Sequence, residues 1–542
     1  MTLKIDRRSL LVTGAWGLGG LALPGFAQTS NVTDARGFTH SVASGEPGAD
    51  TMLLWTRYVP AGGASAMLRA EVSATRDFRR VVAGGAETTG PWRDWTAKVT
   101  VDGLTPGTPY FYRFVAPDGS MSPIGRTKTL PDSAARRFTI ATFSCSNMPF
   151  GYFNAYAHAA ARADIDLSLH VGDYFYEYPR GNYPAEAEAV VARWPLPAGE
   201  ILALADYRLR YASYRADPDL QALHQAKPMI VQWDDHESAN DSWEGGAQNH
   251  QNGEGEWATR RTAAIQAYRE WMPINDEPWK AYEIGGLATL FRTETRLLAR
   301  SKPPELAEVL RGGSDPAGAL KAFRDGAWTD PARTMFGTAQ ESWLFHGLAR
   351  SAREGRRWQI VGSGTNVGRV MTPEIALGWL DASSSPRSQS YVKAGVAAAR
   401  AGLPNNMDNW GGYPAARARF LGAAQRANAN LIVLTGDSHN AWAFDLPGER
   451  GPAGVEFGGH AVSSPGYESG IKRDPKEVAA AVVASSPELK WADTSRRGYM
   501  ATVVTPERVT NDWLFVDTIK TRTPAARVGH SASVMRGRNR MG

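Results

Sequence analysis

The sequence contains one cysteine, Cys145, among 542 residues. A single cysteine cannot form a disulfide within the chain, so a disulfide-stabilised fold is excluded. Long runs of lysine or arginine are also missing, and the formal charge is only +5, so specific nucleic-acid binding is not expected. We find no repeat with a period of roughly 20 to 50 residues, which argues against a solenoid or propeller.

Beyond the N-terminus no segment is apolar enough to cross a bilayer, so stable membrane insertion is not expected. The N-terminus itself is typical of a targeting segment. Arg7-Arg8-Ser9-Leu10-Leu11 precedes a Gly-rich apolar stretch, and Gly25-Phe26-Ala27 has the small-x-small pattern of a cleavage site. We interpret residues 1–27 as a twin-arginine signal peptide, with an ordinary secretory signal as the alternative. The twin-arginine translocase would then be a partner during export, and the mature protein would be periplasmic or secreted.

Residues 28–132 have the pattern of a small all-β, immunoglobulin-like domain. Short alternating stretches are separated by turns such as Asp102-Gly103-Leu104-Thr105-Pro106-Gly107. Pro131-Asp132-Ser133 is a plausible linker at its end. The predicted strands are residues 38–47, 51–56, 68–72, 96–101 and 110–115.

Residues 133–520 instead alternate apolar runs with helical patterns, which predicts an α/β domain with a buried sheet flanked by helices. The predicted strands are residues 138–143, 167–171, 229–233, 359–362 and 431–435, and the clearest predicted helices are 153–163, 259–272 and 415–428. Residues 178–200 and 245–256 are rich in Gly, Pro, Asn and Ala and are interpreted as loops around a site. The basic tail, residues 521–542, is interpreted as a frayed terminus in preference to a lid.

Most of the predicted strands of this domain end in a polar cluster. In α/β folds the carboxyl ends of strands are where chemistry is placed, so we expect these clusters to converge. Carboxylates, a phenol, an imidazole and a thiol together can hold more than one metal ion. The candidate ligands are Cys145, Asp173, Tyr176, Asp235, Asp437 and His439.

Each candidate also has an ordinary structural interpretation. Asp173 could belong to a turn, Asp235 could cap a helix, and Cys145 could be a core residue. Together at successive strand ends they favour a shared metal site. Metal ions neutralise phosphoryl oxygens and activate water, so hydrolysis of phosphate esters is the predicted chemistry. Phenolate and thiolate favour a ferric ion, whereas oxygen ligands suit calcium, magnesium or manganese.

Several motifs give the chain a resemblance to the PhoD family of alkaline phosphatases, which is related to the purple-acid-phosphatase-like metallophosphoesterases. Residues 38–47 resemble the opening of the family's N-terminal domain. Three segments of the chain resemble the family's three metal motifs: Gly172-Asp173-Tyr174-Phe175-Tyr176, Trp233-Asp234-Asp235-His236-Glu237 and Gly436-Asp437-Ser438-His439. Residues 267–273 and 410–415 match as well. The resemblance covers nearly the whole chain.

The resemblance implies a metallophosphoesterase-like sandwich of mixed sheets flanked by helices, carrying ferric iron (Fe3+) and calcium (Ca2+). Cys145 and Tyr176 would hold iron, and Asp173 would bridge iron to calcium. His236 would contact the phosphate or protonate the leaving oxygen, and a metal-bound hydroxide or oxide would attack phosphorus. The remaining ligands implied are Asp235, Asn240, Asp437 and His439.

The chain departs from the family pattern at residues 291–296, 363–366 and Gly411, and none of these departures is expected to touch the ligands. We therefore expect a monomeric, exported alkaline phosphatase acting on small phosphate monoesters and some diesters. A dedicated phosphodiesterase or phospholipase-D-like enzyme on the same scaffold is the first alternative. A secreted binding or adhesion protein with a non-catalytic metal site is the second.

Overall fold

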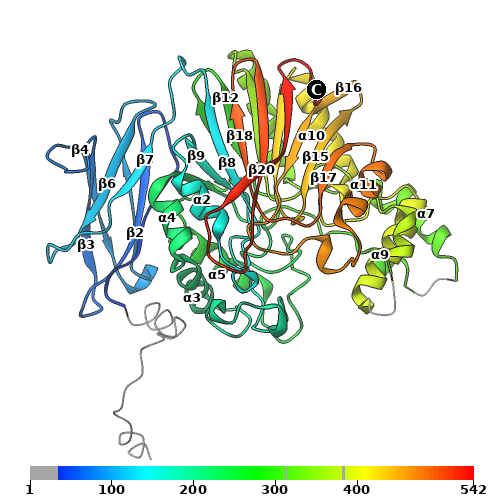
Figure 1. Cartoon of the computed structure of the whole chain (residues 1–542), viewed down its shortest axis with the longest axis horizontal. Helices are drawn as coiled ribbons and strands as arrows, with labels where there is room; N and C mark the ends of the chain where they lie inside the picture. Colours follow the sequence, from blue (N-terminus) through cyan, green and yellow to red (C-terminus); the bar gives the residue numbers. More distant parts are fainter. Residues whose placement is uncertain (1–34, 312–313, 381–384) are drawn as a thin grey trace, which may run out of the picture.

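The computed structural model describes residues 35–311, 314–380 and 385–542 (Figure 1). The predicted signal peptide therefore lies outside the described residues. Two large sheets pack face to face, and a smaller sheet lies at the N-terminal side of the molecule.

The first sheet has nine strands in the order β20-β19-β18-β8-β9-β10-β1-β2-β5. Strands β8, β9 and β10 are parallel neighbours at its centre, and all their residues are buried. Such strands are rich in apolar residues because both faces of the sheet are covered. The strands are β1 (Gly37–Gly45), β2 (Met52–Val59), β5 (Thr96–Val101), β8 (Phe138–Phe143), β9 (Leu167–His170), β10 (Pro228–Val231), β18 (Gly498–Val504), β19 (Arg508–Val516) and β20 (Ala526–Met535).

The second sheet has seven strands in the order β11-β12-β13-β14-β16-β15-β17, with β12, β13, β14 and β16 parallel. A shared apolar core, which includes Ile140, Leu169, Ile360 and Leu434, lies between the two large sheets. The strands are β11 (Lys280–Ile284), β12 (Ala288–Arg292), β13 (Trp358–Ser363), β14 (Leu431–Thr435), β15 (Ala441–Gly448), β16 (Gly451–Gly458) and β17 (Leu489–Asp493).

Helices cover the outer faces of both large sheets. Those against the first sheet are α2 (Asn154–Ala161), α3 (Leu204–Arg215), α4 (Pro218–Ala226) and α5 (Trp257–Trp271). Those against the second are α8 (Gly337–Arg353), α10 (Pro414–Arg426) and α11 (Pro475–Ser485). A smaller lobe contains α6 (Leu306–Val309), α7 (Pro316–Asp325) and α9 (Pro386–Arg400), with a core of its own around Trp328 and Leu403.

The third sheet, in the order β4-β3-β6-β7, packs on β1, β2 and β5 through a separate apolar core. The result is a small sandwich, but it shares a sheet with the rest of the molecule, because β1 pairs in parallel with β10. Sequence periodicity does not reveal which strands become neighbours. The strands of the third sheet are β3 (Ala66–Ser73), β4 (Val81–Thr89), β6 (Pro109–Val115) and β7 (Gly125–Lys128).

The predicted strands and helices of both regions are confirmed to within a few residues. The interpretation of the C-terminal tail as a frayed terminus is wrong. Residues 526–535 form β20, which pairs with β19 along its length and makes one edge of the nine-stranded sheet. Most of its side chains are half-buried or exposed, which is why its sequence has no clear apolar signal.

Candidate metal centre

The polar clusters converge where the parallel strands of the two large sheets end. Cys145 follows β8, Asp173 follows β9, Asp235 follows β10, and Asp437 and His439 follow β14. The loops after β8 and β9 bond to each other, since the Cys145 amide donates to the Gly172 carbonyl and the Ser146 amide donates to the Asp173 carbonyl. The expected convergence of strand ends therefore occurs.

Backbone conformation is unusual at these positions. Cys145 (φ 59°), Asp173 (φ 54°), Asp437 (φ 66°) and His439 (φ 60°) all have left-handed geometry. Residues other than glycine adopt it rarely, and such strain concentrates at functional sites. The surrounding structure thus holds four candidate ligands in conformations that the chain alone would not favour.

One group of ligand atoms contains the sulfur. Cys145, Asp173 and His439 each offer an atom within 4.8 Å of the others. The Tyr176 hydroxyl lies 3.0 Å from His439 Nε2 and 3.3 Å from Asp173 Oδ2. His439 Nδ1 lies 2.8 Å from the Pro465 carbonyl, to which it donates, so Nε2 is left to bind a metal. Burial lowers the pKa of His439 to about 3, which keeps the imidazole in its neutral, ligating form.

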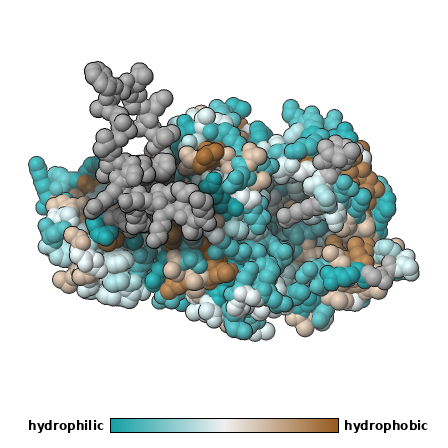
Figure 2. Space-filling model, turned by 90° about the horizontal axis from the view of Figure 1, so that it is seen from below, coloured by the Kyte–Doolittle hydropathy of each residue, from teal (hydrophilic) through white to brown (hydrophobic). Residues whose placement is uncertain are grey.

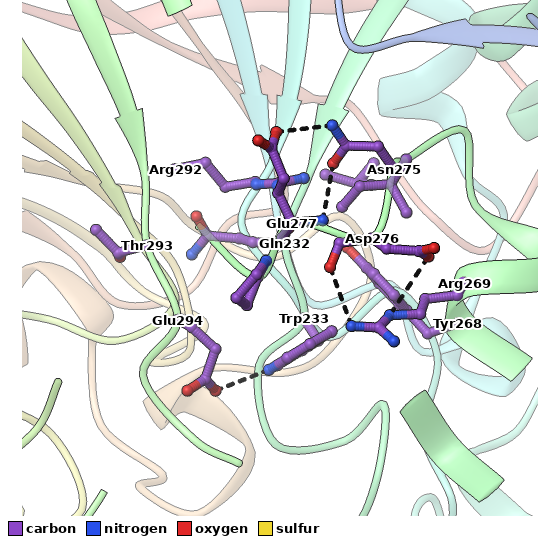
Figure 3. A pocket seen from close by; sticks show the side chains of 13 residues that line it. Gln232, Trp233, Tyr268, Arg269, Asn275, Asp276, Glu277, Arg292, Thr293 and Glu294 are labelled. Carbon is purple, nitrogen blue, oxygen red and sulfur yellow. Dashed lines mark hydrogen bonds and ion pairs between the residues drawn. The ribbon is translucent and has the colours of Figure 1, made fainter. Parts of the chain in front are cut away.

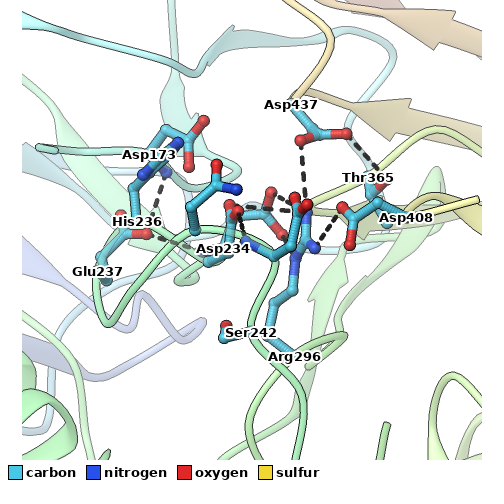
Figure 4. A network of polar contacts seen from close by, with 12 residues as sticks. Asp173, Asp234, His236, Glu237, Ser242, Arg296, Thr365, Asp408 and Asp437 are labelled. Carbon is cyan, nitrogen blue, oxygen red and sulfur yellow. Dashed lines mark hydrogen bonds and ion pairs between the residues drawn. The ribbon is translucent and has the colours of Figure 1, made fainter. Parts of the chain in front are cut away.

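A second group consists of carboxylates. Asp234, Asp235 and Asp437 offer oxygens within 4.8 Å of one another. Figure 4 shows Arg296 reaching into this group from below. Its guanidinium donates to both oxygens of Asp234 at 2.6 and 2.8 Å and to Asp408 at 2.6 Å, and it lies 3.4 Å from Asp437 and 3.6 Å from Asp235.

His236 joins the two groups, because one of its ring nitrogens lies within 4.8 Å of an oxygen of Asp173 and of an oxygen of Asp235. Its Nδ1 is 2.6 Å from Glu177 Oε2, and its ring packs against that of Tyr176 with centroids 4.1 Å apart. Burial opposes the charged imidazolium, but the carboxylates of Glu177 and Asp235 outweigh burial and raise the pKa of His236 well above its ordinary value. A protonated imidazole held in this position can donate a hydrogen bond to an anionic ligand.

The donor set fits bound cations. Asp173 Oδ1 and Asp235 Oδ1 are buried and accept no hydrogen bond from the part of the chain that the structure describes. Burial, with neighbouring carboxylates, raises the pKa of Asp173 and Asp437 well above the ordinary range. Buried carboxylates in this number are costly unless positive charge lies among them, and Arg296 contacts only some of them. Metal ions would supply the missing charge and the missing contacts.

An open cavity of about 830 Å³ leads to these residues. It lies at the end of the sheets that faces the viewer in Figure 2, where hydrophilic residues predominate. His236 and His439 line the cavity floor, and most other lining side chains are aromatic or amide groups, including those of Tyr178, Asn182, Tyr183, Asn240, Asn249, Tyr391 and Tyr467. A second hollow beside Trp233 and Arg292, shown in Figure 3, has about 10 Å³ of free space, enough for about one water molecule.

The structure therefore brings together Cys145, Asp173, Tyr176, Asp235, His236, Asp437 and His439. Asn240 lies on the cavity wall, where its amide donates to Gln248 at 3.0 Å, and its backbone N–H donates to Glu177.

Sequence reasoning missed Arg296, Asp408 and Thr365. Residues 291–296 and 363–366 depart from the family pattern. The expectation that these segments do not touch the ligands is wrong, because Arg296 and Thr365 both contact Asp437. Nothing in the local sequence marks these residues, since their role depends on contacts with strand ends far away in the chain.

Two family models match the chain. The PhoD-like phosphatase model matches residues 140–513, and the model of the N-terminal domain of PhoD-like phosphatases matches residues 25–131. Alkaline phosphatase D of Bacillus subtilis (strain 168) is 31% identical over 500 residues, which are 88% of this chain and 77% of that protein.

Two solved structures are similar in fold. One described as the structure of PhoD superposes with a TM-score of 0.76 at 29% identity, covering 94% of this chain and 92% of that one. Purple acid phosphatase PPD1 from yellow lupin superposes with a TM-score of 0.53 at 12% identity, covering 92% and 74%. The chain belongs to the PhoD-like phosphatase family and is a phosphoric ester hydrolase.

Proposed function

We propose that the protein is an exported, metal-dependent alkaline phosphatase that hydrolyses phosphate monoesters and some diesters. The observation that carries this proposal is the cluster of the buried Cys145, Asp173 and Asp235 with the half-buried Asp437 and His439 beside an open cavity. A site that binds cations at the floor of a cavity is suited to an anionic substrate.

Ferric iron and calcium are the metals that we propose. Cys145 and Tyr176 would hold iron, because thiolate and phenolate favour a strongly Lewis-acidic ion, and Asp173 stands next to both groups. Asp235, Asp437 and Asn240 would offer oxygens to calcium, and His439 a nitrogen to the cluster. When bound, the cations would neutralise phosphoryl oxygens and lower the pKa of nearby water.

The protein's own residues would orient the ester and move protons. His236 is placed to donate a hydrogen bond to the phosphate or a proton to the leaving oxygen. Glu177 fixes the imidazole, and its other oxygen accepts hydrogen bonds from the backbone N–H of Asn240 and from the side-chain amide of Asn249. Arg296 holds Asp234 and Asp408 in place behind the ligands. Because the cations would activate water for the attack on phosphorus, the reaction would need no covalent phosphoenzyme and therefore no side-chain nucleophile.

The volume of the cavity also favours diesters, since about 830 Å³ accommodates an organic group on each ester oxygen. The test compares kcat/KM for nitrophenyl phosphate and bis-nitrophenyl phosphate with protein loaded with iron and calcium. The proposal predicts release of inorganic phosphate from the monoester. Turnover of the diester alone would favour the phosphodiesterase alternative, and no turnover of either would contradict both.

Export by the twin-arginine route and a monomeric state are also proposals. Among the described residues no helix is long and apolar enough to span a membrane. Changing Arg7 and Arg8 to lysine should retain the full-length precursor in the cytoplasm if the twin-arginine route is used, and cell fractionation measures this. Unchanged export would favour the general secretory route.

A further inference from the structure

The end of the molecule opposite the metal centre is rich in arginine. The metal ligands follow the carboxyl ends of β8 and β14, whereas these arginines lie where β8, β13 and β19 begin and just after β20 ends. In Figure 1 the chain terminus marks this upper end of the sheets. We name as the arginine pole the exposed residues Arg136, Arg137, Arg357, Arg508, Arg536 and Arg538.

Direct contacts join the loops that carry the pole. The Arg536 amide donates to the Glu507 carbonyl at 2.9 Å. Asn430 accepts from the Gly537 amide at 2.7 Å and donates to the Arg357 carbonyl at 2.8 Å. Arg136 and Arg508 line one shallow recess of about 410 Å³, together with Met535. The arginines are therefore neighbours on one surface, although they come from distant parts of the chain.

The charge of this surface is poorly compensated. The adjacent Arg356 forms an ion pair with Glu283, but none of the six arginines of the pole has a carboxylate within 4.0 Å among the residues that the structure describes. The acidic residues near the pole are all exposed and fewer than the six arginines: Glu507 lines the recess of Arg136 and Arg508, Asp164 interacts electrostatically with Arg137 beyond ion-pair distance, and Asp132 and Glu354 are close in sequence. Unpaired guanidinium groups concentrated on one face create a positive potential that attracts phosphate groups, to which arginine binds with two parallel hydrogen bonds.

We propose that the arginine pole docks the protein onto an anionic lipid surface through the phosphates of the head groups. The arginines spread over a broad end face. The apolar side chain exposed among them is that of Met535, which is 49% exposed. Because this side chain is not an aromatic ring that could stack on a base, the surface is better suited to lipid head groups than to a nucleic acid. Docking by this end would leave the cavity at the opposite end open to solvent. This inference is independent of the proposed metals and substrates.

The experiment is co-sedimentation of the metal-loaded mature protein with vesicles. Equal parts of phosphatidylglycerol and phosphatidylcholine provide the anionic surface, and phosphatidylcholine alone is the neutral comparison. We expect binding to the anionic vesicles only, and its loss when salt is raised from roughly 0.05 M to 0.5 M, because salt screens exposed charges.

The variant Arg508→Glu/Arg536→Glu/Arg538→Glu should bind anionic vesicles at least about tenfold more weakly. The matched control Arg76→Glu/Arg80→Glu/Lys476→Glu changes the net charge equally at exposed positions away from the pole, and should bind like the wild type. Both variants should hydrolyse a soluble ester normally, which shows that they are folded.

Three results would overturn the proposal. The first is a lack of binding to anionic vesicles at low salt, and the second is an equal loss of binding in both variants. The third is retention on immobilised DNA or polyphosphate without vesicle binding, which would assign the surface to a soluble polyanion.

Discussion

Replacing Arg296 by methionine tests how the charges of the site are held together. The guanidinium is fully buried, as is its partner Asp234, and Asp408 is 12% exposed. Methionine fills much of the volume of the arginine stem but supplies no charge or donor. The change therefore leaves the buried Asp234 without its ion-pair partner, whereas Asp408 keeps Arg300, whose Nη2 lies 2.6 Å from its Oδ1.

Removing one partner of a buried ion pair costs about 3–5 kcal/mol, because the other charge is left uncompensated. Arg296 serves two carboxylates with three hydrogen bonds of 2.6 to 2.8 Å, so we expect a loss of free energy of unfolding within this range in metal-free protein. The loss should be smaller after loading with iron and calcium, because cations bound only by the folded state stabilise it.

The assay is urea denaturation of both proteins, with chelator and with metal. Arg400→Met is the matched control, because Arg400 and Glu374 are both more than half exposed, and it should leave the unfolding midpoint unchanged. An Arg296→Met protein within about 1 kcal/mol of the wild type in chelator would refute the reasoning.

Two further predictions concern histidines. His236→Asn should lower kcat by about 10²- to 10⁴-fold with the fold retained, as steady-state kinetics and circular dichroism would measure, and near-normal turnover would remove His236 from the reaction. Burial lowers the pKa of His460 to about 4. Between about pH 4 and 6.5 the folded state therefore binds fewer protons than the unfolded state. The stability that the neutral His460 contributes is complete above about pH 6.5 and is lost as the pH falls toward 4. His460→Phe should therefore reduce the slope of unfolding free energy against pH by up to about 1.4 kcal/mol per unit in that window, and an unchanged slope would contradict this.

The candidate site was largely predictable because its parts have strong local signals. β8, β9, β10 and β14 are buried throughout and rich in apolar residues, since both sheet faces are covered, and the ligands follow soon after these strands end. A short apolar run followed by Gly-Asp therefore predicts a strand and also predicts that the carboxyl end of that strand lies at the candidate site.

Other features depend on contacts that no local pattern encodes. Arg296 is one arginine among many in the sequence, and only its distance to Asp234 and Asp437 gives it a role. The pairing of β1 with β10 and the edge position of β20 likewise depend on which strands become neighbours. Periodicity predicts that a strand exists but does not specify its partner.

The most direct test of the central claim is elemental analysis of active protein together with its visible absorption spectrum. We expect iron and calcium to co-purify with activity, and a charge-transfer band that weakens or shifts in Cys145→Ala and is lost when Tyr176→Phe is added. Fully active protein that is colourless and free of iron would contradict the account.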